Sequence, residues 1–210
     1  MMLTHNLSLA MKRRNFLILI VLAFLACISI YFFIQNRQIA IENDQNLQEK
    51  REKIAEIKKM NDELNEKLSK IVIPDIIGVD GDSVSHHLSD LVSLKPKLIF
   101  RYSELHCSYC YDAELALLKE YFPEEEQNVA ILCSYQQRRH FLDFISKNDI
   151  KLPIYRIYQE AFDWTLETYG TPYYFVLHPN LMVSHIYIRN NDFPELNRQY
   201  LRSVKRFLSE

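Results

Sequence analysis

Two cysteines separated by two residues, Cys107 and Cys110, are the side chains of this 210-residue chain best suited to chemistry. A thiolate is the nucleophile in disulfide exchange, and this spacing places both sulfurs on one helical turn, close enough to bridge. Cys107 falls at the N-terminal end of an expected helix, where unsatisfied N–H groups and the helix dipole favour the thiolate over the thiol. We therefore expect Cys107 to attack a disulfide and Cys110 to resolve the intermediate.

The same pair of cysteines permits two other interpretations. It could form half of a zinc site, but such sites usually have a second closely spaced pair of ligands, and Cys133 with His140 has the wrong spacing. A purely structural disulfide between Cys107 and Cys110 would close a loop too short to constrain the chain. The spacing therefore favours a redox-active pair, with no metal and no other cofactor.

The surrounding sequence indicates which elements hold the pair. Residues 97–122 contain an apolar, β-prone run, a short polar connection and then apolar residues at helical spacing, which together predict a strand, a loop and a helix. Further strands and helices are predicted at 75–81 (strand and turn), 128–134 (strand), 139–148 (helix), 152–157 (strand), 161–169 (helix), 172–188 (hairpin) and 193–208 (helix). This alternation predicts an α/β domain with a central sheet.

Composition narrows the classes of function. The chain has 13 Tyr and 12 Phe but only three Gly, which predicts a packed core and excludes a disordered or repetitive chain. The formal charge of -2, with acidic and basic residues interleaved, excludes a broad basic surface for nucleic acid. Four cysteines are too few for a disulfide scaffold, and Cys133, inside an apolar run, is expected to be a small buried residue.

The N-terminal part predicts a membrane anchor. Residues 16–34 form an uncharged apolar run of membrane-spanning length, and three basic residues at 12–14 precede it, so the C-terminal part is expected outside the cytoplasm. A cleaved signal peptide would have a shorter apolar core. A lipoprotein with a lipid attached to Cys27 is the second interpretation. It ranks below the anchor because such sites usually have a small residue where this chain has Leu25. We expect a single-pass protein of a bacterial inner membrane, with its C-terminal domain in the periplasm or outside the cell.

Between the anchor and the domain, residues 35–70 predict a helical or coiled-coil stalk. Apolar residues recur at heptad positions, but Lys50 and Asn61 interrupt the seam. A homodimer through this stalk and a monomeric solvated helix are both compatible with the pattern. The predicted organisation is a cytoplasmic N-terminus (1–15), a transmembrane helix (16–34), the stalk (35–70) and the domain (71–210).

Over roughly 73–208 the order of elements, the Cys-x-x-Cys helix and Thr171-Pro172 before a hairpin resemble the thioredoxin fold. The resemblance extends to the bacterial membrane-anchored, TlpA-like thiol-disulfide oxidoreductases. It implies a three-layer domain with a central mixed sheet. It also implies a cis bond at Pro172, and substrate binding by Pro172 and by the backbone of Thr171.

This sequence departs from the family pattern beside the cysteines. His106 stands where the family usually has Trp, and as an imidazolium it could lower the pKa of the adjacent thiol. Six residues before Cys107, where many thioredoxins bury an acid, the chain has Arg101, and Glu104 is the nearest carboxylate. His106 and Glu104 are therefore candidates for tuning the site.

These observations predict a thiol-disulfide oxidoreductase that exchanges disulfides with protein substrates, with the reducing direction favoured. A membrane thiol carrier, or an oxidase for the opposite direction, would reset the pair. A peroxidase is disfavoured because Ser103 to His106 lack the peroxiredoxin signature. The alternative from a non-enzyme class is a redox-sensing or adaptor protein on a dimerising stalk.

Overall fold

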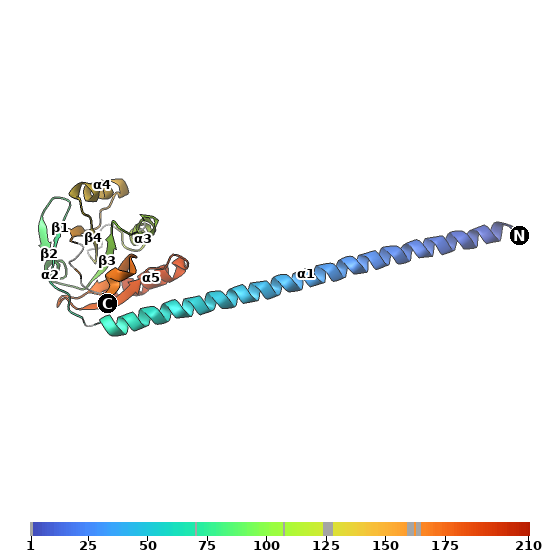
Figure 1. Cartoon of the computed structure of the whole chain (residues 1–210), viewed down its shortest axis with the longest axis horizontal. Helices are drawn as coiled ribbons and strands as arrows, with labels where there is room; N and C mark the ends of the chain where they lie inside the picture. The colour runs from blue at the N-terminus through green and yellow to red at the C-terminus, as the bar shows by residue number, and fades with distance from the viewer. Residues whose placement is uncertain (1, 70, 107, 124–127, 159–161, 163–164) are drawn as a thin grey trace. The chain divides into compact units, whose positions relative to one another are not determined.

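The structure, a computed structural model, describes residues 2–69, 71–106, 108–123, 128–158, 162 and 165–210. Within these ranges the side chains of residues 2–24, 26 and 108–110 lie outside the description. Contacts divide the chain into a first unit that ends at Glu56 and a second unit, Ile57–Glu210. Helix α1 (Met2–Leu68) forms the first unit and contributes its last turns to the second (Figure 1).

In the first unit, α1 covers most of the segment predicted as a stalk. Exposed pairs one turn apart support it, as in the 2.6 Å contact between Lys53 Nζ and Glu49 Oε1. The apolar heptad residue Leu47 is about half exposed. A dimer through this stripe stays a prediction.

Among the described residues, no helix is both long enough and apolar enough to cross a membrane. The predicted span, 16–34, begins in the part of α1 whose side chains lie outside the description. The membrane anchor therefore stays a prediction.

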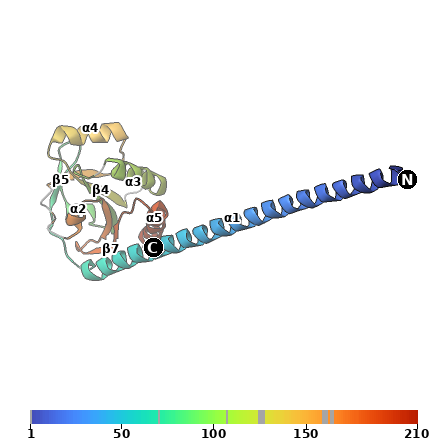
Figure 2. The same ribbon diagram turned by 45° about the vertical axis from the view of Figure 1, so that its right-hand side comes forward.

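The second unit contains a seven-stranded sheet in the order β2-β1-β5-β4-β3-β6-β7 (Figures 1 and 2). Strands β3, β4 and β5 run parallel, whereas β1, β2, β6 and β7 make antiparallel pairs, so the sheet is mixed, as the resemblance implies. The bounds are β1 Ile77–Val79, β2 Ser85–His87, β3 Lys97–Ser103, β4 Val129–Ser134, β5 Ile154–Ile157, β6 Tyr173–Leu177 and β7 Val183–Ile188.

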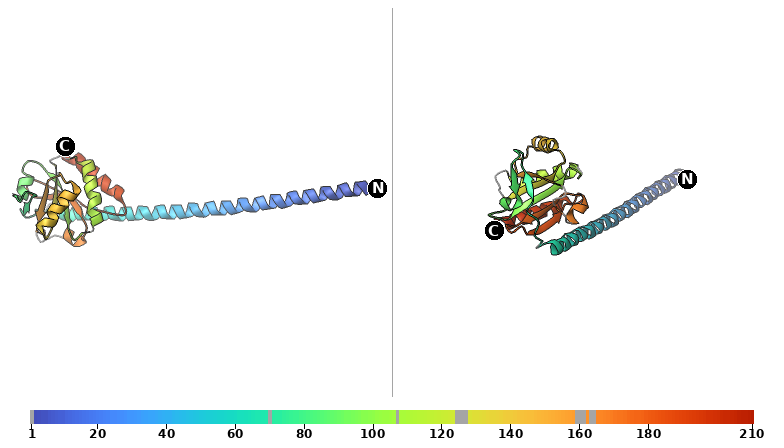
Figure 3. Two further views of the ribbon diagram at one scale, coloured as in Figure 1. Left: turned by 90° about the horizontal axis from the view of Figure 1, so that it is seen from above. Right: turned by 60° about the vertical axis from the view of Figure 1, so that its left-hand side comes forward.

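The helices form the two outer layers. Helix α3 (Ser108–Tyr121) connects β3 to its parallel neighbour β4, and helix α4 (Arg138–Asn148) connects β4 to its parallel neighbour β5. Both connections move the same way along the sheet, so right-handed crossovers place both helices on one face. Helix α5 (Pro194–Ser209) lies beside α3 (Figure 3). The other face carries α2 (Leu88–Leu91) and a 3-10 helix, η2 (Thr165–Tyr169), which is shorter than the predicted helix at 161–169.

Successive side chains of a strand point to opposite faces of the sheet, so the strands contribute to a core on each face. On the face of α3, α4 and α5, aromatic rings from the strands contact aromatic rings from the helices, in the pairs Tyr102–Tyr111, Tyr102–Phe144 and Tyr174–Tyr200. On the opposite face the buried cluster is mostly aliphatic and includes Leu88, Ile99, Ala130, Leu132, Leu166, Phe175 and Leu177. The two cores make the three layers that the resemblance implies.

The last turns of α1 cover the edge of the sheet at β7. Asn61 Oδ1 accepts a hydrogen bond from Ile188 N at 2.9 Å, and Asn65 Oδ1 accepts one from Ile186 N at 2.6 Å. Asn65 Nδ2 also donates to Ile186 O at 2.6 Å. Four residues of helix rise about 6 Å and two residues of strand about 6.6 Å, so the two amides match alternate residues of β7.

The structure thus differs from the predicted organisation at this boundary. Asn61, which interrupts the heptad seam, satisfies the backbone of an edge strand, and Leu64 joins the buried core. Residues 71–73 continue along the same edge, where Val72 makes a β-bridge with Met182. The compact unit starts at Ile57, before the expected boundary at 71. The sequence pattern did not indicate this start, because the contacts that define it form only when the chain folds.

Candidate redox site

Helix α3 follows strand β3 after a short loop, and it contains the second of the two predicted cysteines. Helix α3 begins at Ser108, so the backbone places Cys110 in its first turn, where the sequence predicts it. Cys107 lies outside the described residues, and so does the side chain of Cys110. The residues next to the pair define its surroundings.

The loop between β3 and α3 is held by short-range hydrogen bonds. His106 N donates to Ser103 O at 2.9 Å, and Ser103 N donates to His106 Nδ1 at 3.2 Å. Leu105 N donates to Ser103 Oγ at 3.3 Å. These bonds fix the residue that immediately precedes Cys107.

His106 differs from the expected cationic role. Burial, and secondly the positive charge of Arg101, lower its pKa, while Glu167 acts in the opposite direction. Its Nδ1 also accepts a hydrogen bond, which requires a lone pair on that nitrogen. His106 is therefore a neutral imidazole near pH 7, and it offers a dipole rather than a full charge to the neighbouring thiol.

Arg101, on β3, is fully buried and forms an ion pair with Glu167 of η2. Arg101 Nε and Nη2 donate to the two carboxylate oxygens at 2.9 and 3.1 Å, and Nη2 also donates to Ser134 Oγ at 2.8 Å. Tyr173 OH donates to Glu167 Oε1 at 2.6 Å, and Arg101 Nη1 donates to Tyr102 O. The network joins β3, β4, β6 and η2 two residues before the loop that leads to Cys107.

Sequence analysis did not identify Glu167. The signal available in the sequence was Arg101, a charged residue inside an apolar strand, because a buried guanidinium requires a partner. This signal does not indicate which carboxylate is the partner.

The carboxylate of Glu104 has partners outside that network. Its Oε1 accepts a hydrogen bond from Gln136 N, and its Oε2 lies 3.6 Å from His140 Nδ1 on α4. Its backbone N donates to Ser134 O at 2.9 Å. Glu104 thus anchors the loop to the β4–α4 connection, and its tuning role stays a prediction.

Thr171 and Pro172 lie beside the end of β3. The antiparallel register pairs Arg101 with Tyr173, which places the two preceding residues next to the last residues of β3. Arg189 N donates to Pro172 O at 3.4 Å. Among the described residues there is no cis peptide bond, so the expectation of a cis bond at Pro172 is wrong; the trans form, which X–Pro bonds prefer, leads straight into β6.

The hydroxyl of Thr171 has an unusual environment. Its Oγ1 is buried without a hydrogen-bond partner among the residues that the structure describes. Buried hydroxyls are normally satisfied by protein or by water. Thr171 and Pro172 lie at the end of the sheet where β3 leads toward the cysteines, and their substrate-binding role stays a prediction.

A second buried ion pair holds helix α3 one turn beyond Cys110. Glu114 is fully buried and accepts from Arg189 Nε at 2.8 Å, Tyr174 OH at 2.6 Å and Asn197 Nδ2 at 3.0 Å. These partners come from β6, α5 and the segment after β7. The position of the cysteine helix relative to the sheet is thus set by a saturated carboxylate, which the sequence pattern did not indicate.

Cys133 on β4 is fully buried, and burial raises the pKa of its thiol to about 12. A thiol of that pKa is a poor nucleophile at neutral pH. Its exclusion from the redox pair is therefore physically reasonable. In the described part of the chain, no three His, Cys, Asp or Glu side chains come together as metal ligands.

Comparison with solved structures decides the fold. A thiol:disulfide interchange protein from Bacteroides sp. matches with a TM-score of 0.51 and 17% identity, over 68% of this chain and 91% of that one. The fold is thioredoxin-like. A protein from Bacteroides thetaiotaomicron, assigned provisionally as a protein disulfide isomerase, matches with a TM-score of 0.50 and 14% identity, over 68% and 94% of the two chains. No protein-family model and no curated protein sequence matches the chain.

Proposed function

We propose that this protein is a thiol-disulfide oxidoreductase that acts on disulfides of other proteins through Cys107 and Cys110. The observation that carries the proposal is the place of the Cys-x-x-Cys segment. Helix α3, whose first turn contains Cys110, follows strand β3 of a thioredoxin-like sheet, and Thr171-Pro172 are adjacent to the end of β3 by register. An exposed thiolate at a helix N-terminus is suited to disulfide exchange.

In the reducing direction, the Cys107 thiolate attacks one sulfur of a substrate disulfide and releases the other as a thiolate. The resulting mixed disulfide is attacked by Cys110, which forms the Cys107–Cys110 bridge and releases the second substrate sulfur. Two electrons pass to the substrate, and the protons lost by the two cysteines are balanced by those that the product thiols take up. An extended substrate segment would lie along the backbone of Thr171.

The surroundings set the electrostatics of these steps. Because Arg101 and Glu167 neutralise each other, no unpaired buried charge is left on β3 below the loop. With His106 neutral as well, the helix N-terminus is the main local feature that favours the Cys107 thiolate. This combination favours a moderately reducing pair over a strong oxidant, whose potential depends on a strongly stabilised reduced form.

The proposal includes a membrane anchor at 16–34 and a domain outside the cytoplasm, in a bacterial inner membrane. Support comes from the uncharged run and from the basic residues at 12–14 that precede it. The pair would then be reset by a membrane thiol carrier, or by an oxidase if it works in the opposite direction. Dimerisation through α1 is a further part of the proposal.

The test is reduction of insulin disulfides by dithiothreitol, with the full chain in detergent as catalyst. The intact protein should accelerate the reaction, C107S should abolish the acceleration, and C110S should accumulate a mixed disulfide with the substrate. C27S is the matched control, because Cys27 is exposed and distant in sequence, and it should leave the rate unchanged. An intact chain no faster than C107S would contradict the proposal and favour a non-catalytic redox sensor or adaptor.

The direction of transfer is measured separately, by equilibrating the chain with glutathione or dithiothreitol buffers. A reduction potential near about -270 mV indicates a reductase, and one near about -120 mV indicates an oxidase. Any shortened chain used for this purpose should begin well before Ile57, because Asn61, Leu64 and Asn65 belong to the folded unit.

A further inference from the structure

Two histidines converge on one serine hydroxyl at the end of the sheet opposite the cysteines. His178 Nε2 lies 2.7 Å from Ser184 Oγ, and His185 Nδ1 lies 2.9 Å from the same oxygen. Ser184 pairs with Val176 near the start of β3, whereas the cysteine loop follows the end of β3. The length of that strand separates the two places by about 20 Å.

The backbone is distorted where the two histidines meet. The register between β6 and β7 shifts by one residue between Tyr174 and Val176, and His185, in the bulged part of β7, has a positive φ of 50°. A left-handed conformation is costly for a residue other than glycine, and a bulge redirects a side chain. Here the distortion accompanies a His185 ring that turns back to the side chain of its own neighbour, Ser184.

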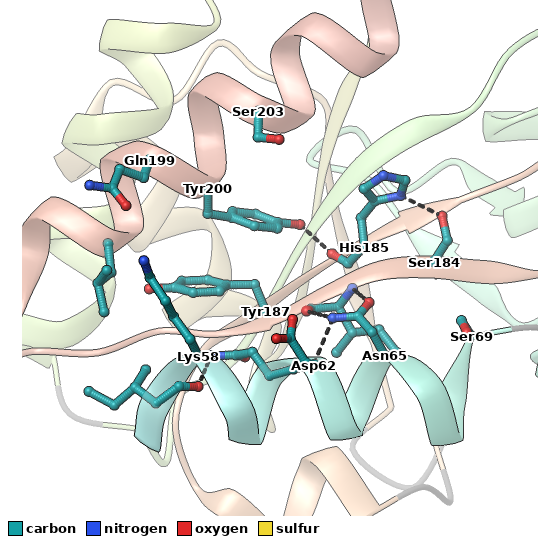
Figure 4. Close-up of a pocket in the computed structure, with 14 residues that line it drawn as sticks. Lys58, Asp62, Asn65, Ser69, Ser184, His185, Tyr187, Gln199, Tyr200 and Ser203 are labelled. Atoms are coloured by element: carbon teal, nitrogen blue, oxygen red, sulfur yellow. Dashed lines mark hydrogen bonds between the residues drawn. The ribbon is translucent and has the colours of Figure 1, made fainter. Parts of the chain in front are cut away.

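Ser184 lines two cavities. One, of about 620 Å³, is formed by the last turns of α1, by β7 and by α5, and both Ser184 and His185 line it (Figure 4). The other, of about 280 Å³, is lined by His178, Met182 and Ser184. Ser184 is thus common to the linings of both cavities.

The two rings share one aromatic neighbour. Phe207 lies against both rings, with centroid distances of 6.4 and 4.2 Å. Among the described residues, no third His, Cys, Asp or Glu joins them, so two nitrogens and one hydroxyl make up the donor set.

We propose that His178 Nε2 and His185 Nδ1 bind one divalent transition-metal ion of the class that prefers imidazole, with the Ser184 hydroxyl and water in the remaining positions. Imidazole nitrogens are common ligands of Zn²⁺, Cu²⁺ and Ni²⁺. A single hydroxyl donates to one ring and accepts from the other, so one ring nitrogen carries a proton. Metal binding moves that proton to the other nitrogen of the same ring, with no net release, and turns the hydroxyl hydrogen away.

This site is independent of the proposed redox reaction, and the experiment separates the two. Zn²⁺ is titrated by calorimetry into a full chain in which C27S, C107S and C110S remove the thiols that could compete for the metal. One equivalent should bind. His178→Ala and His185→Ala should each weaken binding by at least about tenfold, since even residues behind metal ligands have effects of that size.

Two further variants distinguish ligation from a loss of structure. Ser184→Cys places a thiolate between the two rings and should bind Zn²⁺ more than about tenfold more tightly, because thiolate is a preferred zinc ligand. His87→Ala removes an exposed histidine elsewhere and should leave the affinity unchanged. Absence of zinc binding, an affinity unaffected by either histidine variant, or no tightening in Ser184→Cys would each overturn the proposal.

Discussion

Removal of the Glu167 carboxylate should destabilise the domain strongly. The change Glu167→Ala leaves the guanidinium of Arg101 without a counter-charge, and that side chain has no exposed surface. Breaking a buried pair by removing one partner costs about 3–5 kcal/mol, because the remaining charge stays desolvated. This is a large part of the roughly 5–15 kcal/mol that a typical domain has. The free energy of unfolding is measured in urea, by near-ultraviolet circular dichroism of the buried tyrosines.

The matched control is Asp143→Ala on α4, which removes the same chemical group from an exposed pair. Asp143 Oδ2 lies 3.8 Å from Arg139 Nε, and both side chains are mostly in solvent. Such pairs contribute little, so this variant should stay within about 0.5 kcal/mol of the parent. A loss below about 1 kcal/mol in Glu167→Ala, or a loss equal to that of the control, would refute the reasoning. The double change Arg101→Met with Glu167→Leu should recover stability, since no buried charge remains.

Three other predictions concern the edge of the sheet, the loop and the close approach of two strands. Asn65→Ala should lower the free energy of unfolding by about 1–3 kcal/mol, because two backbone groups of β7 lose their partner, as urea titration would show. Because the folded state lowers the pKa of His106, the unfolded chain binds more protons at low pH. The free energy of unfolding should therefore fall as the pH drops below about 6.5. In unfolding measured against pH, His106→Asn should flatten this dependence. Gly78→Ala should cost about 1–3 kcal/mol in thermal or urea unfolding, because the new Cβ would lie 2.8 Å from Tyr155 Cβ, whereas Gly81→Ala, with 3.6 Å to its nearest neighbour, should cost less.

Local pattern alone was sufficient for most of the strands and helices and for the place of Cys110 in the first turn of α3. Apolar, β-prone runs define β3 and β4, helical spacing defines α3, and the absence of Pro and Gly between 36 and 70 predicts a helix. Burial of Cys133 also follows from its apolar neighbours. These features depend on residues within a few positions of one another, so they can be recognised before the chain is folded.

Tertiary structure decided which distant groups meet. Arg101 finds Glu167 across 66 residues, and Asn61 finds β7 across 127, and no local pattern encodes either pairing. The neutral state of His106 and the trans bond at Pro172 likewise depend on the surroundings or on backbone geometry after folding. Hydrogen bonds and charges act over a few ångströms in space, whatever their separation along the chain. The sequence by itself therefore determined the fold class and the candidate cysteines, and only the folded chain determined their electrostatic environment.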